Sequence, residues 1–347
     1  MVETETGGFG DTPAPSLEHA ARKAWRALYP ESIEPLDVEA VQTPTRGKRT
    51  TVYRLKGVGP QGSAVIAKRS RASKAMLERI TYEEVLPHFP GPTLRYYGCA
   101  QEEDGDFSWL FLEDAGGEPY SSHIDEHRLI AARWLGLLHL TAAGLNVQAL
   151  LPHRGTGFYL GELRSARATI LENLGNPVLD PADLSVLRAI ISHYDVLESQ
   201  WGQVDALCGE MPQTVVHGHV ETRNLRVRTT DSGSVLLVFD WETASWGTPA
   251  IDLAQLIFDS VSPPVVAYLS GAGPLWPRLD ARDVHRLAHI GGLFRTILDI
   301  SSETYGLVYE KWASQGPEFA RNYARWCMHD LRTYGTALDQ GIVTLLS

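Results

Sequence analysis

Hydrophobic and polar positions follow two different patterns along the chain, and the first 120 residues favour strands. Apolar residues recur at helical spacing from Leu17 to Leu28, which predicts a helix at the start of the ordered part. The stretches 50–56 and 63–69 alternate or run apolar, and the glycine-rich GVGPQG between them predicts a hairpin. A helix is expected from Ser73 to His88, where FPGP ends it. Two more strands are expected in TLRYY and FSWLFLE.

Beyond residue 120 the pattern becomes mainly helical. HRLIAARWLGLLHLTAA, residues 127–143, carries an apolar stripe at the three-and-four spacing of a buried helix face. Asp180-Pro181 is typical of a helix start, with an N-cap aspartate and a proline in the first turn. Two short strands, NLRVR and VLLVF, flank TTDSGS and predict a second hairpin. Helical patterns resume near Ile251, from Asp283 to Ile300 and from Glu318 to Asp339.

Composition narrows the classes of partner. The chain has 347 residues, 44% of them hydrophobic, and a formal charge of -11 without any block of lysines or arginines. This balance argues against nucleic acid or an anionic membrane as a partner and favours a small molecule. Three scattered cysteines suggest neither disulfides nor a thiolate zinc site. We expect a cytoplasmic protein with a flexible, glycine- and proline-rich tail at residues 1–15.

Oxygen-bearing side chains lie at both ends of the second hairpin. Asn224 begins its first strand, and Asp240 follows its second strand. Because the hairpin is tight, we expect the two side chains to converge on one ion. Magnesium bound to nucleotide phosphates takes one or two protein oxygens of this kind, with phosphates and waters as its remaining ligands. The spacing therefore predicts a magnesium site at Asn224 and Asp240.

The segment around this hairpin resembles the catalytic core of the aminoglycoside phosphotransferase and choline kinase group of small-molecule kinases. That group carries HGDxxxxN, an apolar strand and a D-W-E-x-A-x-x-G-x-P-x-x-D-L-A run, and this chain has HGHVETRN followed by VLLVFDWETASWGTPAIDLAQL. The resemblance implies an α+β, two-lobe, protein-kinase-like fold. Its small N-lobe, with an antiparallel sheet and one main helix, is expected at 16–115, and its larger, mostly helical C-lobe at 116–347.

The resemblance also implies residues that bind the nucleotide. Lys68, at the end of SAVIAK, stands where a kinase lysine grips the α- and β-phosphates. Glu78 is expected to hold this lysine, with Glu83 and Glu84 as rivals. The implied cofactors are Mg²⁺ and a phosphoryl donor, either ATP or GTP.

Two further segments complete the implied nucleotide site. PTRGKRTTVYRL, with Arg46 and Gly47, occupies the place of the phosphate-covering loop but departs from a glycine-rich consensus. LFLEDAGG fits the hinge that offers backbone groups to a purine, at Glu113 and Ala115. In the C-lobe, His217 and Asp252 are expected to support the catalytic loop.

His219 stands where the family has an aspartate, and three interpretations compete for it. In the first interpretation His219 is the general base, because a neutral imidazole can orient a hydroxyl and accept its proton. Alternatively, the missing aspartate marks a pseudokinase that binds nucleotide without turnover. A third interpretation makes His217, His219 and Glu221 the metal ligands of a hydrolase. We prefer the first interpretation. A hydrolase leaves Lys68 and Asn224 without a role, and Lys68, Asn224 and Asp240, the residues that would bind metal and triphosphate, all remain, which speaks against a pseudokinase.

Together these features predict an enzyme, a small-molecule O-phosphotransferase with His219, Asp240 and Asn224 as its catalytic residues. The acceptor is a hydroxyl-bearing small molecule, and an antibiotic, including the nucleoside type, in a resistance or biosynthetic role is favoured. We expect the acceptor to bind among the C-terminal helices, in a region that contains Asp299, Glu303, Tyr305 and Trp312. A monomer or a homodimer is expected.

Overall fold

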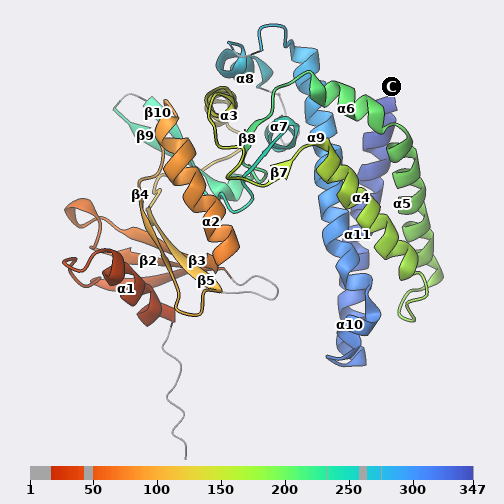
Figure 1. Ribbon diagram of the computed structural model, residues 1–347, viewed down its shortest axis with the longest axis horizontal. Helices are drawn as coiled ribbons and strands as arrows, with labels where there is room; N and C mark the ends of the chain where they lie inside the picture. The colour runs from red at the N-terminus through yellow and green to blue at the C-terminus, as the bar shows by residue number, and fades with distance from the viewer. Residues whose placement is uncertain (1–16, 43–49, 232, 258–263, 275, 347) are drawn as a thin grey trace, which may run out of the picture. The chain divides into compact units, whose positions relative to one another are not determined.

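The computed structural model describes residues 17–42, 50–231, 233–257, 264–274 and 276–346 (Figure 1). These residues form two units: one comprises the described residues up to Arg79 with Leu94–Asp114, and the other comprises Ile80–Thr93 and the described residues from Ala115 onward. The lobe boundary at 115/116 stays a prediction. Arg46, Gly47 and the tail at 1–15 lie outside the described residues.

An antiparallel sheet forms the centre of the first unit. Among the described residues it has five strands, in the order β1-β2-β3-β5-β4. The strands are β1 (Asp37–Gln42), β2 (Thr51–Lys56), β3 (Val65–Arg71), β4 (Tyr96–Gln101) and β5 (Phe107–Glu113). The GVGPQG connection between β2 and β3 contains one short 3-10 turn, η1 (Pro60–Gly62). The predicted hairpin is confirmed.

Helix α1 (Leu17–Leu28) covers one part of this sheet, with the bounds that its apolar spacing predicted. Its Trp25 is buried, and the ring centroid of Trp25 lies 5.3 Å from that of Phe111 and 5.9 Å from that of Tyr97. Alternate residues of β2 face the same core, which is why Tyr53 and Leu55 are buried. Burial of these large apolar side chains stabilises the unit.

The helix predicted for Ser73–His88 forms in three pieces. Helix α2 (Ala72–Ile80) is followed by the π-helical turn η2 (Thr81–Val85) and the 3-10 turn η3 (Leu86–His88). Pro87 has no N–H for the α-helical hydrogen bond, and its ring would clash with the carbonyl four residues earlier, so the α-helix does not continue and the chain forms a 3-10 turn here. Residues 80–93 belong to the second unit, where Phe89 packs against Trp134 with ring centroids 5.1 Å apart.

Helices make up most of the second unit (Figure 1). They are α3 (Asp125–Ala143), α4 (Thr156–Glu172), α5 (Pro181–Ser199), α6 (Trp201–Gly209), α7 (Ala250–Ile257), α8 (Val265–Ala272), α9 (Ala281–Thr304), α10 (Tyr309–Ala313) and α11 (Pro317–Leu346). Helix α5 begins at the predicted cap, where Asp180 and Asp183 form a reciprocal capping box. No described helix is long and apolar enough to cross a membrane.

Two small sheets accompany these helices. One pairs β6 (Glu118–Pro119), β9 (Leu225–Thr230) and β10 (Gly233–Val238), so the predicted second hairpin is confirmed. The other pairs β7 (His153–Arg154), β8 (Thr214–Val216) and β11 (Ser245–Gly247). The short turns are η4 (Thr222–Asn224) and η5 (Tyr305–Leu307).

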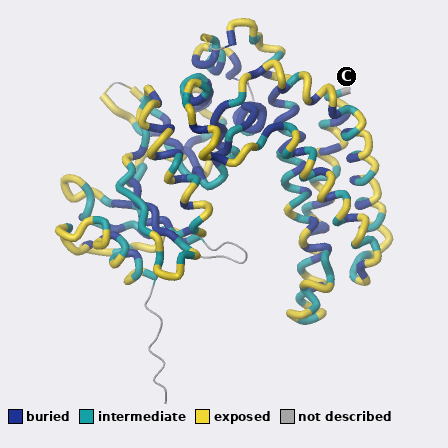
Figure 2. The backbone as a smooth tube through the Cα atoms, in the orientation of Figure 1, coloured by how far each residue is buried: buried dark blue, intermediate teal, exposed yellow. Residues whose placement is uncertain are grey.

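A close contact between α7 and α9 sets the frame of the site. A Cβ atom on Gly291 of α9 would lie 1.8 Å from the carbonyl oxygen of Ala250, so only glycine fits here. Helix α7 is deeply buried, and Figure 2 draws it dark blue. This contact places Asp252 of α7 and Arg295 of α9 on neighbouring helices.

Candidate active site

The loop from His217 to Asn224 connects β8 to β9, and a buried carboxylate holds its first residues. Asp252 Oδ2 accepts a hydrogen bond from the backbone N–H of His217 at 2.8 Å, and Oδ1 accepts from the N–H of Gly218 at 2.7 Å. Gly218 has φ of +75°, a conformation that favours glycine. Asp252 therefore braces the loop, as predicted. His139 is also buried, and its Nε2 lies 3.4 Å from Asp252 Oδ2.

His217 is a structural residue of this loop. Its Nδ1 accepts a hydrogen bond from the backbone N–H of His219 at 3.2 Å, so its Nε2 carries the proton and donates to the carbonyl of Phe239 at 3.1 Å. Burial lowers the pKa of His217, which agrees with a neutral ring. Both ring nitrogens are thus occupied by backbone groups. The interpretation in which His217 is a metal ligand of a hydrolase is not supported.

Asn224 and Asp240 lie at the same end of the β9–β10 hairpin. Leu225 pairs with Val238 in the ladder, and the N–H of Phe239 donates to the carbonyl of Asn224 at 3.1 Å, so Asp240 directly follows the last paired residue. The Asn224 side chain is buried, and its Nδ2 donates to the carbonyl of His219 at 2.9 Å. This bond orients the carboxamide and leaves Oδ1 as its possible metal-binding atom.

Asp240 has a backbone conformation that side chains rarely adopt. Its φ is +70°, in the left-handed region, where aspartate is tolerated better than most residues. One carboxylate oxygen of Asp240 and one of Glu242 lie within 4.8 Å of each other. Carboxylate and carboxamide oxygens are hard ligands that suit Mg²⁺. Glu242 therefore joins Asn224 and Asp240 as a possible ligand that our sequence reasoning had not assigned.

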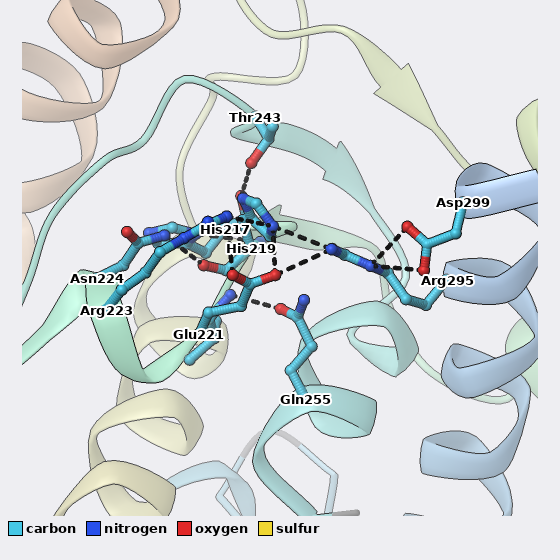
Figure 3. Close-up of polar contacts among 10 residues, drawn as sticks. His217, His219, Glu221, Arg223, Asn224, Thr243, Gln255, Arg295 and Asp299 are labelled. Atoms are coloured by element: carbon cyan, nitrogen blue, oxygen red, sulfur yellow. Dashed lines mark hydrogen bonds and ion pairs between the residues drawn. The ribbon is translucent and has the colours of Figure 1, made fainter. Parts of the chain in front are cut away.

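His219 lies in a polar network with residues of its own loop and of α9 (Figure 3). Its Nε2 is 2.5 Å from Glu221 Oε1, and Arg295 Nη2 donates to that same oxygen at 2.9 Å. Arg223 Nη2 lies 2.8 Å from the other oxygen, Oε2. The hydrogen bond from His219 is the main cause that lowers the pKa of Glu221 to about 2, and both arginines add to it. Glu221 is therefore an ionised hydrogen-bond acceptor.

The predicted acceptor region begins next to this network. Arg295 Nε is 3.3 Å from Asp299, one turn along α9. Burial raises the pKa of Asp299 above its usual range, and burial also raises the pKa of Glu303. Further along, the rings of Tyr305 and Trp312 meet edge to face, with centroids 5.3 Å apart. The region thus combines carboxylates with aromatic rings.

In the first unit, the predicted pair of Lys68 and Glu78 forms. Lys68 on β3 lies opposite Val52 and Leu110 in the sheet, and its Nζ donates to Glu78 Oε1 at 2.6 Å. Both side chains are buried, with 9% and 0% of their surfaces exposed. Buried charges need a partner of this kind. Glu78 rather than Glu83 or Glu84 therefore holds the lysine.

The predicted hinge residues bind other parts of the protein. Glu113 Oε2 accepts from the backbone N–H of Arg95 at 3.1 Å. The carbonyl of Ala115 accepts hydrogen bonds from Arg228, at 3.0 Å from Nε and 2.5 Å from Nη2. Contacts of Glu113 and Ala115 with a purine stay a prediction.

Sequence reasoning had assigned Glu221 only to the metal interpretation and had assigned no role to Arg295. Arg295 stands 74 positions from Glu221 and 76 from His219, so spacing within one motif could not connect them. The only sequence signal was the presence of Glu221 two residues after the unusual histidine.

Comparisons with known proteins agree with this geometry. Solved structures with the same fold include the GDP complex of wild-type aminoglycoside 2′-phosphotransferase-IIIa, at 12% identity and a TM-score of 0.60, covering 92% of this chain and 98% of that one. They also include a choline kinase from Cryptosporidium parvum Iowa II, at 14% identity and 0.56, covering 94% and 97%. A Plasmodium vivax ethanolamine kinase has 14% identity and 0.55, covering 96% and 91%.

These structures confirm the predicted kinase-like α+β fold. No curated protein sequence matches the chain significantly. The model of the phosphotransferase enzyme family matches residues 41–282, which is more than two thirds of the chain. The predicted class of enzyme, a phosphotransferase, is confirmed at this level. The chain belongs to the phosphotransferase enzyme family.

Proposed function

We propose that this protein transfers the γ-phosphoryl group of ATP or GTP to a hydroxyl group of a small molecule. The observation that carries the proposal is the end of the β9–β10 hairpin, where Asn224 and Asp240 lie together beside a loop that Asp252 braces. During transfer the acceptor oxygen loses its proton and bonds to the γ-phosphorus. The bond from that phosphorus to the diphosphate breaks, and ADP or GDP leaves with the electron pair.

Residues of the hairpin would hold the metal. Asn224 Oδ1 and the carboxylate of Asp240 fit Mg²⁺, with Glu242 as a further oxygen ligand. Bound there, Mg²⁺ would supply charge neutralisation of the phosphates.

Other residues have roles in binding and in proton transfer. Lys68, fixed by Glu78, holds the α- and β-phosphates, and Glu113 and Ala115 mark the hinge for the purine. Arg46 and Gly47, which lie outside the described residues, are proposed to bind the phosphates. His219 orients the acceptor hydroxyl and takes its proton, because an imidazole can do both at neutral pH.

The acceptor is proposed to be an antibiotic, including the nucleoside type, which makes the protein a resistance or biosynthetic kinase. Similarity of fold to aminoglycoside, choline and ethanolamine kinases supports a small hydroxylated molecule, and the GDP complex supports GTP as one donor to be tried. We further propose a cytoplasmic monomer or homodimer without nucleic-acid or membrane partners.

A transfer assay tests this function. The purified protein is incubated with Mg²⁺, with ATP or GTP labelled at the γ-phosphate, and with aminoglycosides, nucleoside antibiotics, macrolides, amino alcohols and sugars. We expect label on one acceptor class, and we expect Asp240→Asn to abolish it. No labelled product with any acceptor, while the nucleotide still binds, would refute the transferase.

A second candidate is a nucleotide-binding protein without turnover. The observation that favours it is the contact of His219 Nε2 with Glu221 at 2.5 Å, which occupies one of the two ring nitrogens that could act as a base. Calorimetric binding of Mg²⁺ with ATP or GTP, together with failure of the transfer assay, would establish this second function.

A further inference from the structure

The contact between His219 and Glu221 defines where the ring proton of His219 lies. At 2.5 Å, His219 Nε2 and Glu221 Oε1 are too close to face each other with two lone pairs, so one of them carries a proton. Glu221 is ionised between two guanidinium groups. The proton is therefore on Nε2, and His219 donates it to Glu221.

Arginine nitrogens also lie close to the same ring atom. Arg295 Nη2 is 3.0 Å from His219 Nε2, and Arg223 Nη2 is 3.3 Å from it. Guanidinium nitrogens only donate, and Nε2 donates as well, so these approaches are not hydrogen bonds to the ring. They arise because both arginines bind the carboxylate that the histidine binds.

The ring and the backbone of His219 are held from separate sides. Its N–H donates to His217 Nδ1 at 3.2 Å, and its carbonyl accepts from Asn224 Nδ2 at 2.9 Å. Glu221 holds the ring, and Arg295, which contacts Asp299, holds Glu221 (Figure 3). The His219 side chain is 20% exposed. With Nε2 as donor, Nδ1 is the nitrogen that keeps a lone pair.

We propose, on the basis of the function proposed above, that Glu221 is a positioning residue that fixes His219 as the Nε2–H tautomer and thereby makes Nδ1 the proton acceptor. The hydroxyl O–H bond of the acceptor breaks, its proton moves to Nδ1, and the oxygen bonds to the γ-phosphorus while the diphosphate leaves. The carboxylate of Glu221 stays ionised and stabilises the imidazolium that forms. Where the family has one aspartate, this chain uses a histidine with a carboxylate partner.

A variant pair with a matched control tests this role by kinetics. Glu221→Ala removes the acceptor for Nε2–H and should lower kcat about 10- to 100-fold, with the KM of the acceptor within about twofold. Glu221→Asp keeps a carboxylate that can accept from Nε2–H and should recover part of the lost kcat. Glu221→Gln has no charge to stabilise the imidazolium and can turn its NH₂ group towards Nε2, so it should stay about as slow as Glu221→Ala. If Glu221→Ala keeps the wild-type kcat, or if Glu221→Gln is as fast as the wild type, the proposal is wrong.

Glu198 is the control, because it also binds two arginines and is similarly exposed. It lies 2.7 Å from Arg164 and 2.7 Å from Arg167, with 23% of its side chain exposed against 30% for Glu221. Glu198→Ala removes comparable ion pairs on helix α5, outside the loop. We expect Glu198→Ala to leave kcat unchanged. A loss of kcat equal to that of Glu221→Ala would mean that general destabilisation explains both, and would overturn the proposal.

The tautomer can be measured without turnover. Nitrogen NMR of the histidine side chains, with the His219 signals assigned from a His219→Gln variant, distinguishes protonated from unprotonated ring nitrogens. We expect protonated Nε2 and unprotonated Nδ1 in the wild type, and a mixture of tautomers in Glu221→Ala. A wild-type ring protonated on Nδ1 alone would overturn the proposal. If no acceptor is phosphorylated, the proposed function fails, and this measurement still decides the tautomer.

Discussion

Replacing Asp252 should have the largest effect of any single change at the loop. Asp252 is fully buried and accepts hydrogen bonds from the N–H groups of His217 and Gly218, at 2.8 and 2.7 Å. Asp252→Ala leaves both N–H groups, one buried and one part-buried, without this acceptor, and an unsatisfied buried donor costs about 1 to 3 kcal/mol. We therefore expect a loss of about 4 kcal/mol in the free energy of unfolding of the second unit.

Asp252→Asn separates charge from geometry. Its carbonyl oxygen can still accept from one of the two N–H groups, but its NH₂ group faces the other donor, so about 2 kcal/mol of stability should be lost. The loop also carries His219 and Asn224, and a displacement of about 1 Å at reacting groups can lower a rate about 100-fold. We therefore expect Asp252→Asn to fold but to have kcat lowered by this order.

Urea unfolding followed by tryptophan fluorescence measures both variants, since Trp241 and Trp134 lie in this unit. Asp195→Asn is the control: Asp195 accepts from Arg167 at 2.6 Å but is 61% exposed, and exposed ion pairs contribute only about 0.2 to 1 kcal/mol. If the free energy of unfolding of Asp252→Ala lies within about 1 kcal/mol of the wild-type value, its loss is no larger than that expected of the control. Other contacts would then fix the loop, and our reasoning would be wrong.

The remaining predictions concern the other carboxylates, the metal, the helix contact and a thiol. Glu78→Ala should destabilise the first unit by about 3 kcal/mol in calorimetry and weaken nucleotide binding, because Lys68 loses its buried partner. The control is Asp37→Asn, which breaks an exposed pair with Lys56 and should change neither stability nor nucleotide binding. Equal losses in the two variants would contradict this prediction. A chelator should abolish phosphoryl transfer, and added Mg²⁺ should restore it for the wild type but not for Asp240→Asn; transfer that survives the chelator would exclude the proposed metal. Gly291→Ala should lower the melting temperature and kcat together, since its Cβ would collide with the carbonyl of Ala250, and an unchanged melting temperature would refute that contact. Burial raises the pKa of the Cys208 thiol to about 12 from its ordinary 9.0, so its thiolate at pH 8 is about a thousandfold scarcer, and mass spectrometry should find it resistant to iodoacetamide until the protein unfolds; rapid modification of native Cys208 would contradict this.

Elements with a strong apolar period were predictable from the sequence. Helix α1 and strand β5 have the predicted bounds, because the buried residues of α1 recur at helical spacing and β5 is an apolar run with five consecutive buried residues. Edge strand β1 was missed, since five of its six residues are exposed and no apolar alternation marks it. Helix α4 was also missed, although Tyr159, Leu163, Ala166 and Ile170 are buried at helical spacing. Strands β7, β8 and β11 have only two or three residues each, too few to show a period.

The candidate site was predictable where one motif contains all its parts. Asn224, Asp240 and Asp252 lie within 29 positions, and the hairpin between the first two fixes their relation. Lys68 and Glu78 stand 10 positions apart, on adjacent elements. Arg295 could not be found in this way, because only the packing of α9 against α7 brings it to the loop. Tertiary contacts of this kind leave no local pattern in a single sequence.

The histidine at position 219 becomes interpretable only through those tertiary contacts. Taken alone, an imidazole in place of an aspartate indicates either a different base or a lost one. In the structure, one carboxylate from α7 fixes the backbone at residues 217 and 218, and a second carboxylate, Glu221, fixes the ring. Arg295 of α9 fixes that second carboxylate. We propose that this arrangement, which would order both the backbone and the tautomer of His219, serves proton transfer, because a general base must be held within reach of the proton that it accepts.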